Sequence, residues 1–403
     1  MWTRYYSGVV WPHTTRSWGR TGRLRSTLGL VTVCGLVGSS AFRAQDRAPV
    51  TSSVFPSELI WTARFEGVPT EHMAATTGHL LLLLRDSRLL AFSLATGSLS
   101  WTLAEASNLR PAIDGDLVAV ADGRRLRGVD ETTGQVRWEA TLPAPPASAP
   151  VAGGGWLIVP IEGGLLEARR GQDGSVIWTR PLAGNLTATP TIAGDRLLCS
   201  VDDKTLLVLD IETGEPLWSQ TLGERPATPL VVDGKIYVGA KTNFLYSFDE
   251  RSGRELWRWR TGGDIVGEPA VDATHLYFVS LDNLLRALDR RSGNLRWQRA
   301  LSSRARSGPV VVGDTILVSS YAPEVRAFSV FTGRPTGKFE IPAELLAGPP
   351  VVTAPGADQA PLVLVASTAG RLFAYRRRLG LLVSPLQELP GELVTLVPPV
   401  PEP

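Results

Sequence analysis

A phrase of about twelve residues returns along this chain at a spacing close to 40 residues. It reads LDIETGEPLWSQ from Leu209, VDETTGQVRWEA from Val129 and FDERSGRELWRW from Phe248. Alignment on the residue that closes the phrase gives Trp61, Trp101, Trp138, Trp178, Trp218, Trp257 and Trp297, with Phe339 in the next place. Proline opens the units with the same period, at Pro111, Pro150, Pro190, Pro229, Pro269, Pro309 and Pro349. Two unrelated residue types thus report one period, which indicates a repeat architecture.

Each unit contains four short apolar runs, and four strands in about 40 residues are typical of one blade of a β-propeller. In one unit the expected strands are 189–194, 196–201, 205–210 and 215–220. Turns of GD or DG type and ETG type separate them, since Asp, Thr and Gly suit tight turns. The sequence therefore predicts an all-β fold.

The aromatic residue at the end of each phrase is predicted to be structural. A four-stranded blade cannot bury both of its faces alone and must pack against its neighbours. A large indole at one fixed place per blade supplies much of that contact area. We therefore expect the seven tryptophans and Phe339 to pack between blades.

The two ends of the repeat predict how the ring closes. The last unit has three strands and no tryptophan strand, whereas SELIWTARF, near Trp61, is an outer strand with nothing before it. Pairing the two completes eight blades and removes open sheet edges. The predicted organisation is 1–41 as a signal peptide or N-terminal anchor, 42–56 as a linker, 57–378 as the eight-bladed propeller and 379–403 as a proline-rich tail.

The first residues resemble an export signal. An arginine-bearing stretch precedes the apolar run STLGLVTVCGLVGSSAF, and Ser39 and Ala41 have the spacing of a cleavage site. The run has 17 residues, which also allows an uncleaved membrane anchor. Lipidation at Cys34 is a third alternative, although the residues before it are a poor match for lipoprotein processing. We expect an exported protein of the periplasm or cell envelope.

Charge and reactive residues exclude several functions. The chain has 41 basic and 39 acidic side chains, so no excess positive charge favours nucleic acid. The histidines after the signal, His72, His79 and His275, lie in separate units, and Cys199 in an apolar strand would be the only cysteine left after cleavage. We predict no catalytic, cofactor-binding or metal-ligating residues.

The segments that connect the blades predict where a partner binds. They vary between units, as do the turns between the second and third strands, and binding residues concentrate on variable loops of rigid scaffolds. These segments also carry apolar and arginine side chains, and two of the turns add Phe244 and Tyr321. Either these form an exposed patch suited to a protein partner, or each apolar side chain packs onto its own inner strand. The candidate residues are Leu109, Arg110, Leu186, Arg225, Ile265, Val266, Leu345 and Leu346.

With DxxTGxxxW-type units at this spacing, the chain resembles the quinoprotein-type (PQQ-like) repeat family of eight-bladed propellers over about residues 57–378. One branch of that family holds dehydrogenases that use pyrroloquinoline quinone (PQQ) and calcium. Here the vicinal cysteine pair common in that branch is absent, and no CxxCH haem motif occurs. The chain is more similar to the branch of BamB, the scaffold lipoprotein of the outer-membrane β-barrel assembly machine.

The resemblance implies a non-catalytic scaffold that binds a protein partner in the cell envelope, such as a component of that assembly machine. No cofactor is expected in this case. The alternative is a dehydrogenase that depends on PQQ and calcium, or a relict of one, with its cofactor in the central channel near Glu268 and Arg110.

Overall fold

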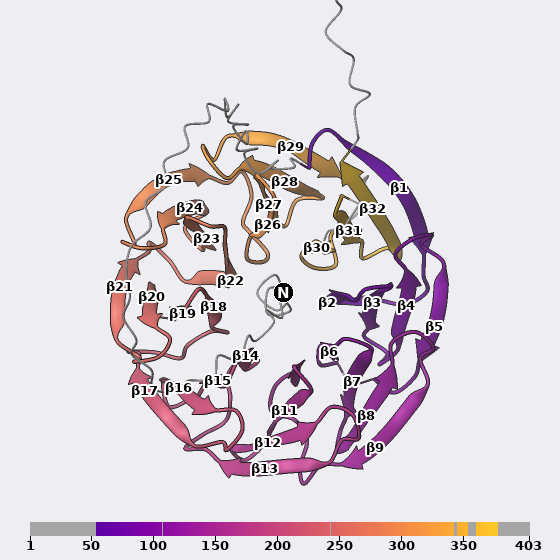
Figure 1. The fold of residues 1–403 in the computed structure, drawn as a ribbon. Coiled ribbons are helices and arrows are strands. Elements are labelled where there is room, and N and C mark those ends of the chain that lie inside the picture. Colours follow the sequence, from indigo (N-terminus) through magenta and orange to yellow (C-terminus); the bar gives the residue numbers. More distant parts are fainter. Residues whose placement is uncertain (1–53, 107, 242, 342–344, 354–359, 378–403) are drawn as a thin grey trace, which may run out of the picture.

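Eight four-stranded antiparallel sheets stand around a central channel (Figure 1), in a computed structural model that describes residues 54–377 except 107, 242, 342–344 and 354–359. The first strand of each sheet lines the channel, and the fourth strand lies on the outer circumference of the propeller. This confirms the predicted fold. The predicted signal or anchor at 1–41, linker residues 42–53 and the tail at 379–403 lie outside the described residues.

We number the sheets as blades 1 to 8 and give their strands from the channel outwards. Blade 1 has β2 (Pro69–Ala75), β3 (His79–Leu84), β4 (Leu89–Ser93) and β5 (Leu99–Leu103); blade 2 has β6 (Ala112–Asp114), β7 (Leu117–Asp122), β8 (Arg125–Asp130) and β9 (Val136–Thr141). Blade 3 has β10 (Val151–Gly153), β11 (Trp156–Ile161), β12 (Leu165–Arg170) and β13 (Val176–Pro181); blade 4 has β14 (Thr191–Ala193), β15 (Arg196–Ser200), β16 (Thr205–Asp210) and β17 (Pro216–Thr221). Blade 5 has β18 (Leu230–Val232), β19 (Lys235–Ala240), β20 (Phe244–Asp249) and β21 (Glu255–Arg260); blade 6 has β22 (Ile265–Val271), β23 (His275–Ser280), β24 (Leu284–Asp289) and β25 (Leu295–Ala300). Blade 7 has β26 (Val310–Val312), β27 (Thr315–Ser319), β28 (Glu324–Ser329) and β29 (Pro335–Glu340); blade 8 has β30 (Val351–Val352), β31 (Leu362–Ala366), β32 (Arg371–Arg377) and β1 (Ser57–Arg64).

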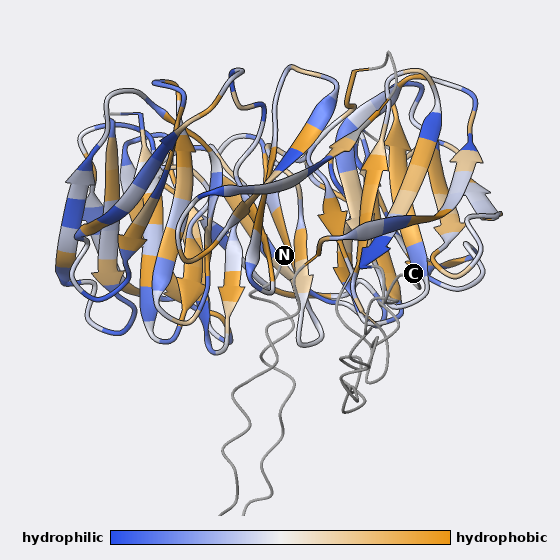
Figure 2. Cartoon of the chain, turned by 90° about the horizontal axis from the view of Figure 1, so that it is seen from above, coloured by the Kyte–Doolittle hydropathy of each residue, from blue (hydrophilic) through white to orange (hydrophobic). Residues whose placement is uncertain are grey.

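The strands run across the thickness of the ring, so the ring has two distinct faces (Figure 2). On the turn face lie the turns between first and second strands and between third and fourth strands. On the link face lie the turns between second and third strands and the links from one blade to the next. Among the described residues there is no helix with the length and apolar character needed to cross a membrane.

The turn glycine and the tryptophan of the recurring phrase contact each other at seven blade boundaries, which are all except the one between blades 7 and 8. The indole Nε1 of each of the seven aligned tryptophans donates a hydrogen bond of 2.8–3.2 Å to a backbone carbonyl of the following blade. A Cβ added to the turn glycine of that following blade would lie within 3.0 Å of the indole, as for Gly253 against Trp218 and Gly293 against Trp257. These glycines have positive φ and lie directly against the indole of the preceding blade, which explains why Gly and Trp recur together. The apolar core is accordingly divided into clusters between neighbouring blades, for example Val151 and Ile158 of blade 3 with Leu197 and Cys199 of blade 4.

Ring closure follows the prediction, but the residues at the last boundary differ from it. Strand β1 pairs with β32 from Ser57 opposite Arg377 to Arg64 opposite Arg371. In blade 6, Trp297 stands opposite Ala287, and the equivalent pair in blade 7 is Gly337 opposite Ala327. The alignment of Phe339 with the tryptophans is therefore wrong by two residues.

The ring of Phe55 occupies the place of the missing indole. It lies 2.7 Å from where a Cβ on Gly337 would be, and its centroid is 4.8 Å from that of Phe339. Phe339 is buried and packs on Tyr375 of blade 8 at 4.7 Å between centroids, so it does lie between blades. Val54 is also buried, so the described residues of the predicted linker pack against the propeller.

Candidate functional site

Two of the predicted partner-binding residues are buried. Leu186 is 5% exposed and Leu346 is 1% exposed, and each belongs to an apolar cluster between blades. The cause is backbone pairing: Leu186 forms an isolated bridge with Val201, and Leu346 forms one with Ser367. The links extend the inner strand, which directs these side chains into the core. Both side chains are therefore buried, as the second alternative expected, but they pack between neighbouring blades and not on their own inner strand alone.

Backbone pairing also directs the side chains of Ile265 and Val266 toward the core. They lie in β22, opposite Ser280 and Val279, and both pack half-buried against apolar clusters. Ile265 lies close to Gly239 of blade 5, where an added Cβ would be 3.2 Å from its Cδ1. These side chains join blades and contribute little free apolar surface.

The remaining predicted residues are spread over three links. Leu345 is 53% exposed in the link between blades 7 and 8. Leu109 and Arg110 are half-buried in the link between blades 1 and 2, and Arg225 is exposed in the link between blades 4 and 5. The predicted ring of apolar contacts is therefore reduced to one sector.

That sector lies over blades 7, 8 and 1, and Leu281, which is 41% exposed in the turn between β23 and β24 of blade 6, lies next to it in the order of blades. Besides Leu345 the sector contains Tyr321, which is 59% exposed in the turn between β27 and β28, and Val68, which is 51% exposed just before β2. Tyr321 was expected from the sequence, whereas Val68 was not. Phe244, the other aromatic residue expected on this face, is half-buried against an apolar cluster instead. We call Val68, Tyr321 and Leu345 the apolar rim.

A pocket of about 360 Å³ opens beside the apolar rim at the mouth of the channel. Its polar lining comes from five separate segments, which contribute Thr70, Glu71 and His72 of β2, Arg85, Asn108, Arg306 and Thr368. The apolar rim is connected to it directly. Val68 is part of the lining, and the backbone N–H of the lining residue Thr368 donates a 2.9 Å hydrogen bond to the Leu345 carbonyl.

An irregular stretch of β2 shapes one wall of the pocket. The pairing with β3 shifts between Pro69 and Met73, so Thr70, Glu71 and His72 leave the regular ladder. The hydroxyl of Thr70 donates to the Leu83 carbonyl at 2.9 Å and accepts the backbone N–H of His72 at 3.1 Å. Bulges of this kind commonly redirect side chains near functional sites.

Arg306 forms the opposite wall in a fixed orientation. Its Nη1 donates a 2.7 Å hydrogen bond to the Leu346 carbonyl, and its guanidinium carbon lies 5.8 Å from the centre of the Tyr321 ring. The cation–π contact and the hydrogen bond together restrict the side chain. The pocket thus presents a preoriented guanidinium next to an exposed aromatic ring.

The charge of the wall formed by β2 depends on its neighbours. Burial is the main cause that lowers the pKa of His72; Glu71 opposes the shift and the guanidinium of Arg110 adds to it. His72 is therefore neutral at pH 7. The lining then carries Arg85 and Arg306 against one carboxylate, Glu71, with Arg110 close by.

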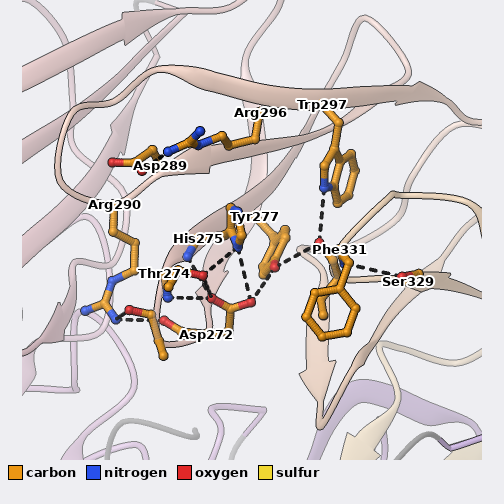
Figure 3. A network of polar contacts seen from close by, with 12 residues as sticks. Asp272, Thr274, His275, Tyr277, Asp289, Arg290, Arg296, Trp297, Ser329 and Phe331 are labelled. Atoms are coloured by element: carbon orange, nitrogen blue, oxygen red, sulfur yellow. Dashed lines mark hydrogen bonds and ion pairs between the residues drawn. The ribbon is translucent and has the colours of Figure 1, made fainter. Parts of the chain in front are cut away.

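A second polar cluster, on the turn face, holds blades together (Figure 3). The hydroxyl of Tyr277 donates to Asp272 at 2.5 Å and lies 3.3 Å from the Val330 carbonyl, which also accepts the indole N–H of Trp297. Arg290 reaches back to Asp233 of blade 5 at 2.9 Å. Burial first, and then Asp272, raise the pKa of Tyr277, so its hydroxyl stays protonated as a donor. These contacts pair the polar groups of turns in neighbouring blades, and we assign this cluster a structural role.

The residues present do not fit the quinone–calcium pair. Within the described ranges no three His, Cys, Asp or Glu side chains come close enough together to hold a metal ion. Cys199 is fully buried, and burial raises the pKa of its thiol to about 12. Glu268 lies in the bulge of β22 and Arg110 in the link between blades 1 and 2. We derive no chemistry through this cofactor.

Comparisons with known proteins show to which family the chain is similar. A sequence model of the family described as "Outer membrane protein assembly factor BamB" matches residues 17–151, 146–239 and 220–388. The BamB protein of Yersinia pestis is 24% identical over 400 residues, covering 88% of this chain and all of the relative. That of Burkholderia pseudomallei is 27% identical over 270 residues, covering 60% of this chain and 68% of the relative.

Solved structures share the fold at lower identity. The crystal structure of BamB from Moraxella catarrhalis has a TM-score of 0.65 and 19% identity, covering 81% of this chain and 99% of its own. Sqt1 of Saccharomyces cerevisiae reaches 0.67 at 11% identity, covering 78% and 98%. Since proteins with different names share this propeller, the structural likeness shows the fold alone. The family match over most of the length shows more: this chain belongs to the family of the outer membrane protein assembly factor BamB.

Proposed function

We propose that this protein is a non-catalytic scaffold of the cell envelope that acts in outer-membrane protein assembly. Family membership over most of the chain carries the proposal. The name of the relatives states an assembly function, and the described residues hold no cluster of metal-ligating side chains that would add a reaction to it.

The link face is the proposed docking surface, in the sector over blades 7, 8 and 1. The apolar rim of Val68, Tyr321 and Leu345 lies there beside arginine side chains, a composition that favours protein interfaces. Buried clusters join blade 7 to blade 8 and blade 8 to blade 1, and the indole of Trp61 adds a hydrogen bond at the boundary between blades 8 and 1. A rigid support of this kind lowers the entropic cost of binding a partner.

Loss of the protein in its source bacterium tests the proposal. Deletion of the gene should lower the amount of folded β-barrel protein in the outer membrane, and the wild-type gene should restore it. Leu345→Asp should fail to restore it, because a carboxylate in the apolar rim opposes docking. Phe331→Asp is the matched control, since Phe331 is 63% exposed on the turn face of blade 7.

Unchanged levels of folded β-barrel proteins after deletion would refute the assembly function. Equal failure of Leu345→Asp and Phe331→Asp, with both proteins folded, would retain the function but refute the link face as the docking surface.

A further inference from the structure

We infer that the pocket at the channel mouth binds a carboxylate group of a partner peptide, with the apolar rim holding the neighbouring apolar side chains of that peptide. This inference rests on the proposed function, because it names the chemistry of the partner at the same surface. Neither the family match nor the names of the relatives assign this pocket.

The size of the pocket sets the first limit. At about 360 Å³ it lies at the low end of binding pockets and admits one side chain or one chain terminus, but not a folded element. The partner must therefore insert a short segment. The rest of the contact falls on the apolar rim around it.

The donors in the lining select an anion. Arg85 and Arg306 contribute guanidinium groups, and a guanidinium presents its N–H donors in a planar fork that matches a carboxylate. The Leu346 carbonyl accepts from Arg306 through Nη1 and fixes the direction of the group. Asn108 and Thr368 add short polar side chains at the same opening.

The single acidic group in the lining does not cancel this preference. Glu71 is exposed, whereas Arg306 is half-buried and oriented by Tyr321. Charged groups at partly buried sites are screened less by water than exposed ones. The neutral state of His72 leaves the two arginines as the dominant charges.

The apolar rim distinguishes a peptide from a small inorganic anion. Tyr321 lies under the Arg306 guanidinium, and Leu345 is joined through its carbonyl to the lining residue Thr368. An occupant with a carboxylate flanked by large apolar side chains satisfies both parts. Free phosphate satisfies only the arginines.

Fluorescence anisotropy with labelled hexapeptides tests this inference on the purified propeller chain. The probes are LEFELG with an amidated C-terminus, its isostere LQFQLG with an amidated C-terminus, and LQFQLG with a free C-terminus. We expect at least one carboxylate-bearing probe to bind about tenfold more tightly than the amidated LQFQLG, and to weaken as salt is raised. The better of the two carboxylate probes shows whether the side chain or the terminus enters the pocket.

Two variants and one control locate the site. Arg306→Gln should weaken binding of the carboxylate probe about tenfold, and Arg85→Gln, at an exposed position with little effect on folding, should weaken it several-fold. Arg304→Gln is the control, because Arg304 is exposed on the same link but outside the pocket lining. Equal binding of all three probes, absent binding up to millimolar concentration, or an equal loss with Arg304→Gln would overturn the inference. The deletion experiment is independent of these peptides, so failure of the pocket chemistry and failure of the assembly function can be told apart.

Discussion

Each turn glycine of the recurring phrase contacts the indole of the preceding blade, so adding one methyl group to such a glycine should lower the free energy of unfolding substantially. Gly293 has φ +72°, and a Cβ built on it would lie 2.7 Å from Cδ2 of Trp257. Trp257 is 9% exposed, and its Nε1 is hydrogen-bonded to the Arg290 carbonyl at 3.2 Å, so the ring cannot move away freely. Gly293→Ala should therefore open the boundary between blades 5 and 6.

The magnitude has two parts. Placing a Cβ in the left-handed region costs about 1 kcal/mol, and overpacking a fixed neighbour adds about 1–3 kcal/mol. The control is Gly194→Ala, because Gly194 has φ +56° and nothing lies within 4 Å of its added Cβ. Gly194→Ala should cost the first part alone. The difference between the two variants measures the contact with the indole.

Urea unfolding followed by circular dichroism measures these costs as shifts of the midpoint at constant slope. A second background sharpens the test: in Trp257→Leu, which leaves room at the turn, Gly293→Ala should cost no more than Gly194→Ala. Equal midpoints for the two glycine variants in the wild-type background would refute the reasoning, as would an unchanged cost of Gly293→Ala in the Trp257→Leu background.

Three further predictions concern ring closure, acid stability and the buried thiol. Phe55→Ala should lower the free energy of unfolding by about 2–3 kcal/mol, because its half-buried ring replaces the missing indole over Gly337; a thermal melt that matches wild type would contradict this. Hydrogen bonds from Arg137 and then from Thr133 lower the pKa of Asp130 to about 2, so its stabilising effect is present above the ordinary pKa near 3.8 and is lost as the pH falls from about 4 to 2. Urea midpoints of Asp130→Ala and wild type should therefore differ at pH 6 and converge near pH 2, and a constant difference would argue against the ionised carboxylate. In a Cys34→Ser background, Cys199 should react with a thiol reagent only after unfolding, since burial raises its pKa to about 12; labelling of the native protein at a rate typical of an exposed thiol would show that blades 3 and 4 separate.

The repeat period predicted the fold well because each blade obeys the same local chemistry. Asp, Thr and Gly form the same turn in blades 2 and 4, and Ser takes the place of Thr in the same turn of blades 5 and 6. Trp returns where the turn glycine of the next blade leaves room for the indole. The repeat did not predict the contacts at the boundary between blades 7 and 8. Gly337 replaces the tryptophan, and the ring that fills the place comes from Phe55 at the other end of the propeller, so no local pattern connects them.

The candidate site was harder to predict for a physical reason. Whether a link side chain is exposed depends on its backbone pairing with the second strand, and that pairing buries Leu186 and Leu346 but leaves Leu345 exposed. The pocket also combines segments far apart in the chain. One signal was present: the first unit reads PTEHM, and Pro69 stands 32 residues before Trp101, whereas the opening prolines of the later units stand 27 or 28 residues before their tryptophans; the extra residues fall in the irregular part of β2.

Site-specific photo-crosslinking in the source bacterium tests the central claim, that the link face over blades 7, 8 and 1 binds the assembly partner. A photoreactive amino acid at Tyr321 or Leu345 should capture a component of the outer-membrane assembly machinery, identified by mass spectrometry, while the same amino acid at Phe331 on the turn face should not. Capture from Phe331 at the same yield, or capture of that component from Phe331 alone, would contradict the account.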